Sequence, residues 1–199
     1  NLTVETTYKV NKTTIDIFIE ASTDKTTLCN FTNHSYFNLD GAKNIANHNL
    51  IVNCDNVLPV DKDGIPISKP VSAKELNLDF KNSRKLSDKG KPTEIDHNFC
   101  ISNIRQSLRA NAIVSAKNIS LELMSTEPGL QIYTGKGLDS GSDEGWGKFP
   151  YNEFAGIALE PQIWPDSPNQ SGFPSPYLRP HERYKHHTRI KFNNSNNEK

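Results

Sequence analysis

A regular alternation of apolar and polar residues near the amino terminus constrains the fold of this 199-residue chain more than any other feature. Isoleucine occupies three alternate positions of segment 12–20, namely Ile15, Ile17 and Ile19. Because successive side chains of a β-strand point to opposite faces of a sheet, this pattern predicts a strand with one buried face. Segment 3–10 alternates in the same way. The sequence therefore predicts two antiparallel strands joined at Asn11.

Further runs rich in apolar and β-branched residues predict more short strands. They are 26–31, 48–54, 111–116, 119–125, 129–135, 154–160 and 183–192. Segment 55–98 is rich in Asp, Lys, Pro and Gly and is expected to form turns. Pro161 is expected to end the strand before it, since proline has no backbone N–H. With no long period of 3.6 residues, the pattern predicts an all-β fold, a large antiparallel β-sandwich.

Charge and hydropathy exclude several classes of protein. The 23 Lys and Arg residues balance the 23 Asp and Glu residues, which argues against a general affinity for nucleic acid or anionic membranes. The chain has neither a signal-peptide pattern nor the run of about 20 apolar residues that spans a bilayer. A hydrophobic content of 34% still suffices for a core. We therefore expect one soluble domain over residues 1–192 and a polar tail over 193–199.

The cysteines and asparagines bear on the cellular compartment. Cys29, Cys54 and Cys100 are widely spaced and form no CxxC motif, which favours a reduced, cytoplasmic location. Seven N-x-S/T sequences would mark a surface glycoprotein if the chain were secreted; they begin at Asn1, Asn11, Asn30, Asn33, Asn118, Asn169 and Asn193. Because Asn occurs 22 times, several of these matches arise by chance. Asn30 and Asn33 also lie in an aromatic stretch where a glycan would fit badly.

Ionisable and aromatic residues gather beside strand-like runs in the segments 33–41, 94–99 and 156–170. His34 could transfer protons near neutral pH, although a single histidine more often bonds backbone groups in a core. Glu160 follows an apolar run, where partial burial would raise its pKa and make it a base near pH 7. A surface glutamate at a strand end explains the same run equally well.

Two further pairs of residues suit sugar binding. Asp96 and His97 adjoin beside an aromatic residue, and carboxylates bind hydroxyl groups while rings stack on apolar sugar faces. The alternative for Asp96 is a turn cap. Trp146 and Trp164 could be stacking platforms, although tryptophans more often pack in a core.

Common motifs for metals and cofactors are missing from the sequence. His181, His186 and His187 do not form a zinc motif, and nucleotide-binding and serine-hydrolase signatures are absent. The basic run 183–189 is expected to be a solvated strand.

Taken in order, four motifs resemble the aldose 1-epimerases, the galactose mutarotases. They are NHSYFNLDG with His34, EIDHNF with Asp96, TEPGLQIYTG with Gln131, and GIALEPQIWPDSPNQ with Glu160. The resemblance extends over about residues 25–192 and implies a large β-sandwich with the sugar in an open cleft.

The resemblance also implies roles for individual residues. Glu160 would be the base and His34 the acid that interconvert the anomers of a free sugar such as galactose or glucose. Ser35, Tyr36, Asp96 and Gln131 would contact the substrate, and no cofactor would be required. The family has a second active-site histidine and an Asn-Arg contact near its amino terminus, and this chain lacks both. The resemblance therefore predicts the carboxy-terminal part of an aldose 1-epimerase-like domain, with an incomplete sandwich.

Three functions remain open from the sequence. The first is a mutarotase that acts on free hexoses. The second is a carbohydrate-binding or regulatory domain of the same fold without turnover. The third is a relative that acts on hexose phosphates, for which a cluster of Arg or Lys near the cleft would be expected. No such cluster stands beside the motifs, although the fold could bring Arg179 and Arg183 there.

Overall fold

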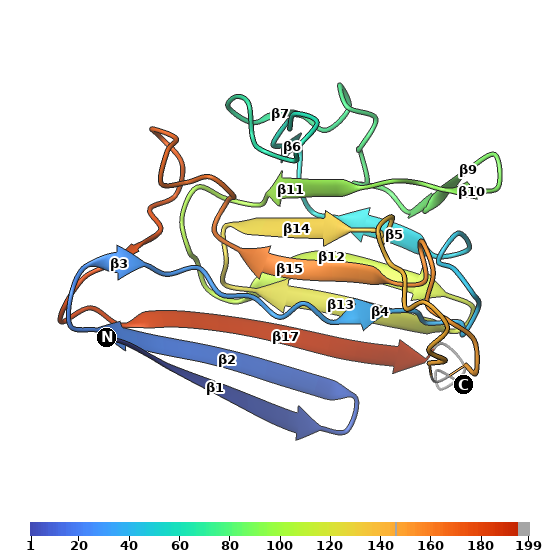
Figure 1. Ribbon diagram of the computed structural model, residues 1–199, viewed down its shortest axis with the longest axis horizontal. Helices are drawn as coiled ribbons and strands as arrows, with labels where there is room; N and C mark the ends of the chain where they lie inside the picture. Colours follow the sequence, from blue (N-terminus) through green and yellow to red (C-terminus); the bar gives the residue numbers. More distant parts are fainter. Residues whose placement is uncertain (146, 195–199) are drawn as a thin grey trace.

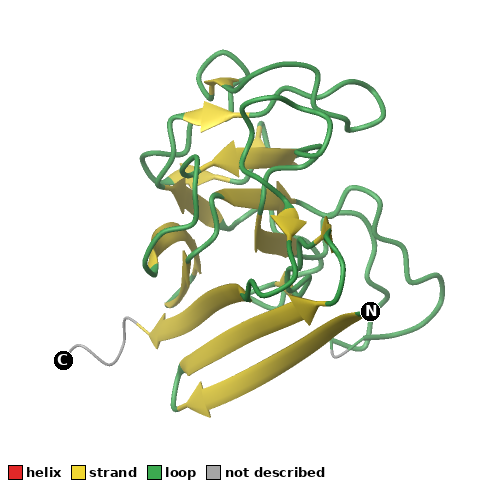
Figure 2. Cartoon of the chain, turned by 90° about the vertical axis from the view of Figure 1, so that its left-hand side faces the viewer, coloured by secondary structure: helices red, strands yellow, loops and turns green. Residues whose placement is uncertain are grey.

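The computed structural model describes residues 1–145 and 147–194. These residues form strands and loops without a helix, and hence without a helix that could span a membrane (Figure 2). All pairings between named strands are antiparallel. The all-β, antiparallel prediction is confirmed.

The strands form two main sheets and two small ones (Figure 1). The first main sheet has seven strands in the order β1 (Leu2–Asn11), β2 (Thr14–Thr23), β17 (Tyr184–Asn194), β13 (Ile119–Ser125), β12 (Arg109–Ala116), β5 (Asn49–Val52) and β8 (Arg84–Lys85). The second has six in the order β4 (Tyr36–Phe37), β15 (Ile157–Gln162), β14 (Gly129–Tyr133), β11 (Asp96–Cys100), β6 (Asn56–Val57) and β7 (Val71–Ser72). The small sheets pair β9 (Ser87–Asp88) with β10 (Lys91–Pro92) and β3 (Thr27–Leu28) with β16 (Tyr177–Leu178).

The core lies between the two main sheets. Alternate residues of the seven-stranded sheet, such as Ile17 of β2 and Leu121 of β13, belong to one buried cluster with Ile132 of β14 and Leu159 of β15. Both sheets thus bury one face against the other, as expected of a sandwich. Consequently, the other face of the six-stranded sheet is available for polar side chains.

The predicted amino-terminal hairpin is present. Asn11 pairs with Thr14, and the two-residue loop contains Lys12 at a φ of 54°. In Figure 1 this hairpin forms one border of the seven-stranded sheet. The apolar residues of β1 share a face with the buried isoleucines of β2, yet they remain exposed: Val4 is 41% and Val10 is 72% accessible.

The expectation that Pro161 ends a strand is wrong. Strand β15 continues to Gln162, and Pro161 pairs with Leu130 of β14. The strand tolerates proline because its other neighbour, β4, pairs only with Ile157 and Ala158. A missing N–H on that unpaired edge costs no ladder hydrogen bond.

The basic carboxy-terminal run is also not a solvated strand. Strand β17 lies between β2 and β13, and its alternate residues Tyr184, His186 and Thr188 are buried. Only the intervening side chains, such as Lys185, turn away from the core. A run with three basic residues on one face can therefore occupy the middle of a sheet, because the period of a strand is two.

Segment 55–98 is more ordered than a series of turns. It contains the short strands β6 to β10 and contributes Leu58, Phe80 and Leu86 to the buried interior. At the other end, β17 runs through Asn194 and so includes the first two residues of the expected tail. Residues 195–199 of that tail lie outside the described residues.

Candidate functional site

Polar side chains gather on the face of the six-stranded sheet that points away from the core. In β11, Phe99 joins the core cluster, so its neighbour Asn98 points to the opposite face. Asn98 pairs with Gln131 of β14, and Gln131 pairs with Glu160 of β15. Directly paired residues share a face. Strand register therefore lines up Asn98, Gln131 and Glu160 across three strands.

A second row lies beside the first. Asp96 of β11 pairs with Tyr133 of β14, Tyr133 pairs with Ala158, and Ala158 pairs with Tyr36 of β4. The small side chain of Ala158 leaves room between the two tyrosine rings, whose centroids are 6.2 Å apart. The site is thus bordered by a carboxylate at one end and aromatic rings at the other.

Glu160 and His34 meet on this face. The Nε2 atom of His34 lies 3.4 Å from Oε1 of Glu160. The Glu160 side chain is 10% exposed and that of His34 is 51% exposed. Burial raises the pKa of the Glu160 carboxyl, the nearby imidazole of His34 opposes that rise, and Asp96 adds to it. A carboxylate held in this way can accept a proton nearer to neutral pH than an ordinary glutamate.

Asp96 and Gln131 form a polar pair next to Glu160. The Gln131 amide donates a hydrogen bond of 2.6 Å to Oδ1 of Asp96. The carbonyl oxygens of Gln131 and Asn98 are buried without a hydrogen-bond partner. Buried acceptors without a donor are costly in a protein. Since both of these side-chain oxygens are closed off from solvent, the exposed carboxylate of Asp96 is the acceptor of this pair that a hydroxyl group can reach.

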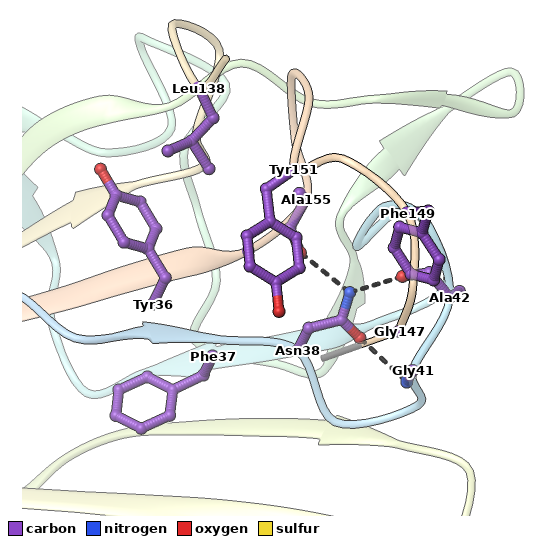
Figure 3. A pocket seen from close by; sticks show the side chains of 11 residues that line it. Tyr36, Phe37, Asn38, Gly41, Ala42, Leu138, Gly147, Phe149, Tyr151 and Ala155 are labelled. Atoms are coloured by element: carbon purple, nitrogen blue, oxygen red, sulfur yellow. Dashed lines mark hydrogen bonds between the residues drawn. The ribbon is translucent and has the colours of Figure 1, made fainter. Parts of the chain in front are cut away.

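Tyr36 connects the site with an adjoining cavity. The centroid of its ring lies 5.1 Å from that of the His34 ring. Burial raises the pKa of the Tyr36 hydroxyl, and the nearby Tyr133, Glu160 and Asp96 raise it further. The cavity of about 400 Å³ is shown in Figure 3, and its walls are mainly apolar. The side-chain amide of Asn38 supports the wall by donating to the carbonyls of Ala42 and Ala155.

Ser35 also lies on this side of the molecule, between His34 and Tyr36. Its side chain is exposed, and its backbone N–H donates to Oδ1 of Asn33 at 3.2 Å. This short turn precedes β4, so Ser35 lies between His34 and Tyr36 in the chain, while no contact of its side chain with the site is seen among the described residues. The structure thus brings His34, Tyr36, Asp96, Gln131 and Glu160 together, with Ser35 beside them.

Other candidates lie elsewhere. His97 follows Asp96 on the core-facing side, where burial lowers its pKa. Trp164 is buried against Phe173 and donates its indole N–H to the carbonyl of Pro128, so it packs in the interior. Trp146 lies outside the described residues. Arg179 pairs with the nearby Glu182 at 3.5 Å, within one turn of the chain.

The remaining histidines do not suggest a metal centre. His186 is buried among hydroxyl and carbonyl groups, and His187 bonds Asp16 at 2.6 Å. Within residues 1–145 and 147–194, no three His, Cys, Asp or Glu side chains are grouped as metal ligands would be.

Sequence analysis missed Tyr133, Asn98 and Asn30. Tyr133 could have been found, because it stands two residues after Gln131 and so shares its face. Asn98 could have been found in the same way, because it stands two residues after Asp96 and shares the face of that residue. Asn30 could not, since its contact with Ile163 joins segments that are distant in the sequence.

The sequence is similar to those of known proteins. A family model described as aldose 1-epimerase matches residues 1–191. The galactose mutarotase of Mus musculus is 37% identical over 197 residues, which are 96% of this chain and 57% of that protein. The aldose 1-epimerase of Escherichia coli K12 is 35% identical over 190 residues, 89% of this chain and 54% of that protein.

Solved structures show the same fold. A GalM/aldose epimerase homologue from C. elegans superposes with a TM-score of 0.87 and 26% identity, covering 97% of this chain and 60% of that one. A galactose 1-epimerase from Lactobacillus acidophilus NCFM gives a TM-score of 0.78 and 25% identity, covering 98% of this chain and 57% of that one. The chain spans little more than half the length of these curated relatives and solved structures.

Proposed function

We propose that the protein is a mutarotase, because the chain belongs to the aldose 1-epimerase family. The reaction interconverts the α and β anomers of a free aldose by opening and closing the sugar ring. The observation that carries the proposal is the contact between the buried Glu160 carboxylate and the His34 imidazole.

The two groups suit the two proton transfers of this reaction. Glu160 takes the proton of the C1 hydroxyl, while the imidazolium of His34 gives a proton to the ring oxygen. The electron pair of the bond between C1 and the ring oxygen stays on that oxygen, and C1 becomes an aldehyde carbon. The C1 hydroxyl oxygen and the ring oxygen are both bonded to C1. The base and the acid must therefore lie close enough together for each to reach its own oxygen within hydrogen-bond distance.

Closure reverses these steps. Rotation about the bond between C1 and C2 presents the other face of the aldehyde to the ring hydroxyl. The neutral His34 takes back the proton of that hydroxyl, and the protonated Glu160 returns its proton to the C1 oxygen. Both residues end in their starting states, so the cycle balances without a redox or metal cofactor.

The remaining side chains would bind the sugar. Hydroxyl groups can donate to the exposed carboxylate of Asp96, and we include Gln131, whose amide donates to that carboxylate, as a further contact. The rings of Tyr36 and Tyr133 offer apolar surfaces for the C–H groups of the sugar. We include Ser35 as a further contact because it precedes Tyr36 on the exposed turn.

The finer assignments belong to the same proposal. We expect free hexoses such as galactose and glucose as substrates, residues 1–192 as the catalytic domain, and a cytoplasmic location. The substrates are suggested by the named activities of the relatives, the domain by the family match over residues 1–191, and the location by the three free cysteines.

Polarimetry tests the proposal. Freshly dissolved α-D-galactose and α-D-glucose should reach anomeric equilibrium faster with this chain than in buffer alone. Glu160→Gln should remove the acceleration, since an amide cannot accept the proton. Glu75→Gln, at an exposed turn beyond β7, is the matched control and should retain it. An undiminished rate with Glu160→Gln would overturn the assignment of the base.

A carbohydrate-binding domain without turnover is the second candidate function, because Asp96 and Gln131 could hold a sugar whether or not Glu160 and His34 transfer protons. Calorimetry that shows sugar binding, together with polarimetry that shows no acceleration, would favour a binding domain. Acceleration by the wild-type chain would exclude a purely binding role.

A further inference from the structure

The segment that carries His34 runs antiparallel to β15, but only part of it is held by a strand ladder. Phe37 pairs with Ile157, and Tyr36 pairs with Ala158. The same register, continued two residues further, places His34 opposite Glu160. The regular pairing ends before this point, so the backbone ladder alone does not fix His34.

Pro161 explains why the ladder ends. The residues of an antiparallel strand direct their N–H and C=O groups alternately to their two neighbours. Ile163 directs both groups towards the segment that carries His34, because it bonds Asn30 there. Pro161, two residues earlier, faces the same edge and has no N–H to offer. A gap in backbone pairing thus lies beside Glu160.

The side chain of Asn30 resumes the pairing beyond this gap. Its Oδ1 accepts the N–H of Ile163 at 2.9 Å, and its Nδ2 donates to the carbonyl of Ile163 at 3.1 Å. A side-chain amide has the same donor and acceptor as a peptide group, so the pair of bonds imitates a β-bridge. Asn30 stands four residues before His34, and Ile163 stands three residues after Glu160.

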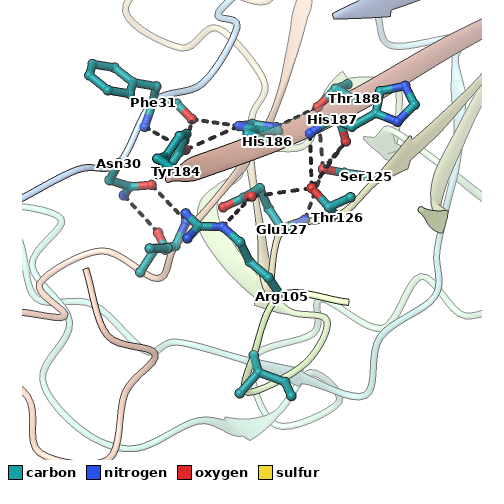
Figure 4. A network of polar contacts seen from close by, with 12 residues as sticks. Asn30, Phe31, Arg105, Ser125, Thr126, Glu127, Tyr184, His186, His187 and Thr188 are labelled. Carbon is teal, nitrogen blue, oxygen red and sulfur yellow. Dashed lines mark hydrogen bonds and ion pairs between the residues drawn. The ribbon is translucent and has the colours of Figure 1, made fainter. Parts of the chain in front are cut away.

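Buried groups of β17 hold the next residue, Phe31 (Figure 4). Its N–H donates to the hydroxyl of Tyr184 at 3.3 Å, and its carbonyl lies 3.0 Å from Nδ1 of His186. Since a carbonyl only accepts, Nδ1 carries the proton, and Nε2 accepts from the hydroxyl of Thr188 at 2.8 Å. Burial lowers the pKa of His186, which favours this neutral form.

We propose that Asn30 is a positioning residue, which sets the register that brings His34 opposite Glu160. It does so from outside the site, because the two hydrogen bonds of its side-chain amide join it to the backbone of Ile163 rather than to the acid or the base. The effect expected on kcat rests on the proposed function, whereas the effect expected on the pKa of Glu160 does not.

The ionisation of Glu160 reports the position of His34 without any need for turnover. The titratable groups that face this carboxyl are His34, Asp96 and Tyr36. Of these, His34 lowers its pKa, so displacement of the imidazole should raise it further. Carbon NMR of the Glu160 carboxyl should show a rise of about half a unit or more in Asn30→Ala.

A double-mutant cycle separates this effect from a general loosening of the structure. In a His34→Gln background, Asn30→Ala should leave the pKa of Glu160 unchanged, because the imidazole is already gone. Asn30→Gln, whose amide lies one methylene further out, is a milder second variant and should raise the pKa less. Asn53→Ala is the matched control: Asn53 is also exposed and donates to a backbone carbonyl, that of Ala110, at the seven-stranded sheet.

The pKa of Glu160 in these variants decides whether Asn30 positions His34. A raised pKa with His34 present and no change without it supports the proposal. An unchanged pKa in both folded Asn30 variants, or an equal rise in the His34→Gln background, overturns it. If the wild type accelerates mutarotation, Asn30→Ala should lower kcat about tenfold or more while KM changes little. If the wild type does not, the proposed function fails, but the NMR comparison still decides the role of Asn30.

Discussion

At the scale of single residues, the site depends on a carboxyl group that folding makes less acidic. Burial is the main cause of the raised pKa of Glu160, and Asp96 contributes in the same direction. Ionised Glu160 is therefore less stable in the folded protein than in the unfolded chain. This contribution opposes folding at neutral pH and disappears as the pH falls through the raised pKa and the carboxyl becomes protonated. A group that reduces stability in this way is typical of a functional site.

The first prediction concerns the pH dependence of this base. The rate should fall on the acid side as Glu160 takes up a proton, at a higher pH than for an ordinary glutamate. Asp96→Asn removes a charge that raises the pKa of Glu160, so it should move this acid limb to lower pH, besides weakening sugar binding. The profile of kcat/KM against pH checks the shift. An acid limb that stays in place would show that Asp96 does not act on the ionisation of Glu160.

At the scale of strands, β17 joins the amino-terminal hairpin to the rest of the sheet. Its Arg189 pairs with Asp16 of β2, and the guanidinium donates two hydrogen bonds to that carboxylate, at 2.8 and 3.1 Å. His187 lies 2.6 Å from the same carboxylate and stacks on Phe18. The outward face of a central strand is thus occupied by an ion-pair network, which a count of basic residues alone does not reveal.

The second prediction concerns this network. The hydrogen bond from Arg189, together with that from His187, lowers the pKa of Asp16 below its ordinary value of 3.8, although burial opposes the shift. Asp16→Asn should therefore reduce the free energy of unfolding at pH 7 by about 1 kcal/mol. A carboxyl with a lowered pKa stabilises the fold above its unfolded-state pKa, and this stability is lost as the pH falls through the lowered value.

Urea denaturation of both proteins at pH 7 and again well below pH 3.8 measures the effect. The difference between wild type and Asp16→Asn should shrink at the lower pH, because protonated Asp16 resembles the amide. A difference that is equal at both values would assign the effect to packing rather than to charge.

Much of this element-level structure could be predicted from the sequence. The alternation of Ile15, Ile17 and Ile19 gave the correct strand and the correct buried face. Pro161 was misleading because the effect of a proline depends on whether its edge is paired, and pairing is decided by β4, more than 100 residues away. Local patterns also could not show that His34 meets Glu160, since that contact requires the order of strands in the sheet. The resemblance to a family supplied those roles.

At the scale of the whole molecule, the two sheets do not cover each other fully. The inner face of the seven-stranded sheet continues through β2 to β1, where Leu2, Val4 and Val10 remain exposed. The hydrophobic contribution to stability is thus concentrated in the strands from β2 to β5, whose inner residues belong to the buried cluster, and it does not extend to β1.

The third prediction follows from this uneven cover. Val114 of β12 is fully buried, whereas Val10 of β1 is 72% exposed. Val114→Ala should lower the free energy of unfolding by about 2 to 3 kcal/mol, because it removes two buried carbon groups and leaves a cavity. Val10→Ala should change it by no more than about 0.5 kcal/mol. Chemical denaturation measures both, and a large loss with Val10→Ala would show that β1 is covered in solution.

The amide of Asn30 has a practical consequence for producing the protein. Asn30 begins the acceptor sequence N-F-T, and its Nδ2 atom is the one that bonds Ile163. In a secretory expression host, oligosaccharide could be attached to that nitrogen while the chain is still emerging. The attached sugar would replace one hydrogen of the Asn30 amide and crowd the backbone of Ile163, to which that amide donates. Bacterial cytoplasm, or an Asn30-preserving Thr32→Ala change that removes the acceptor, would keep the amide unmodified.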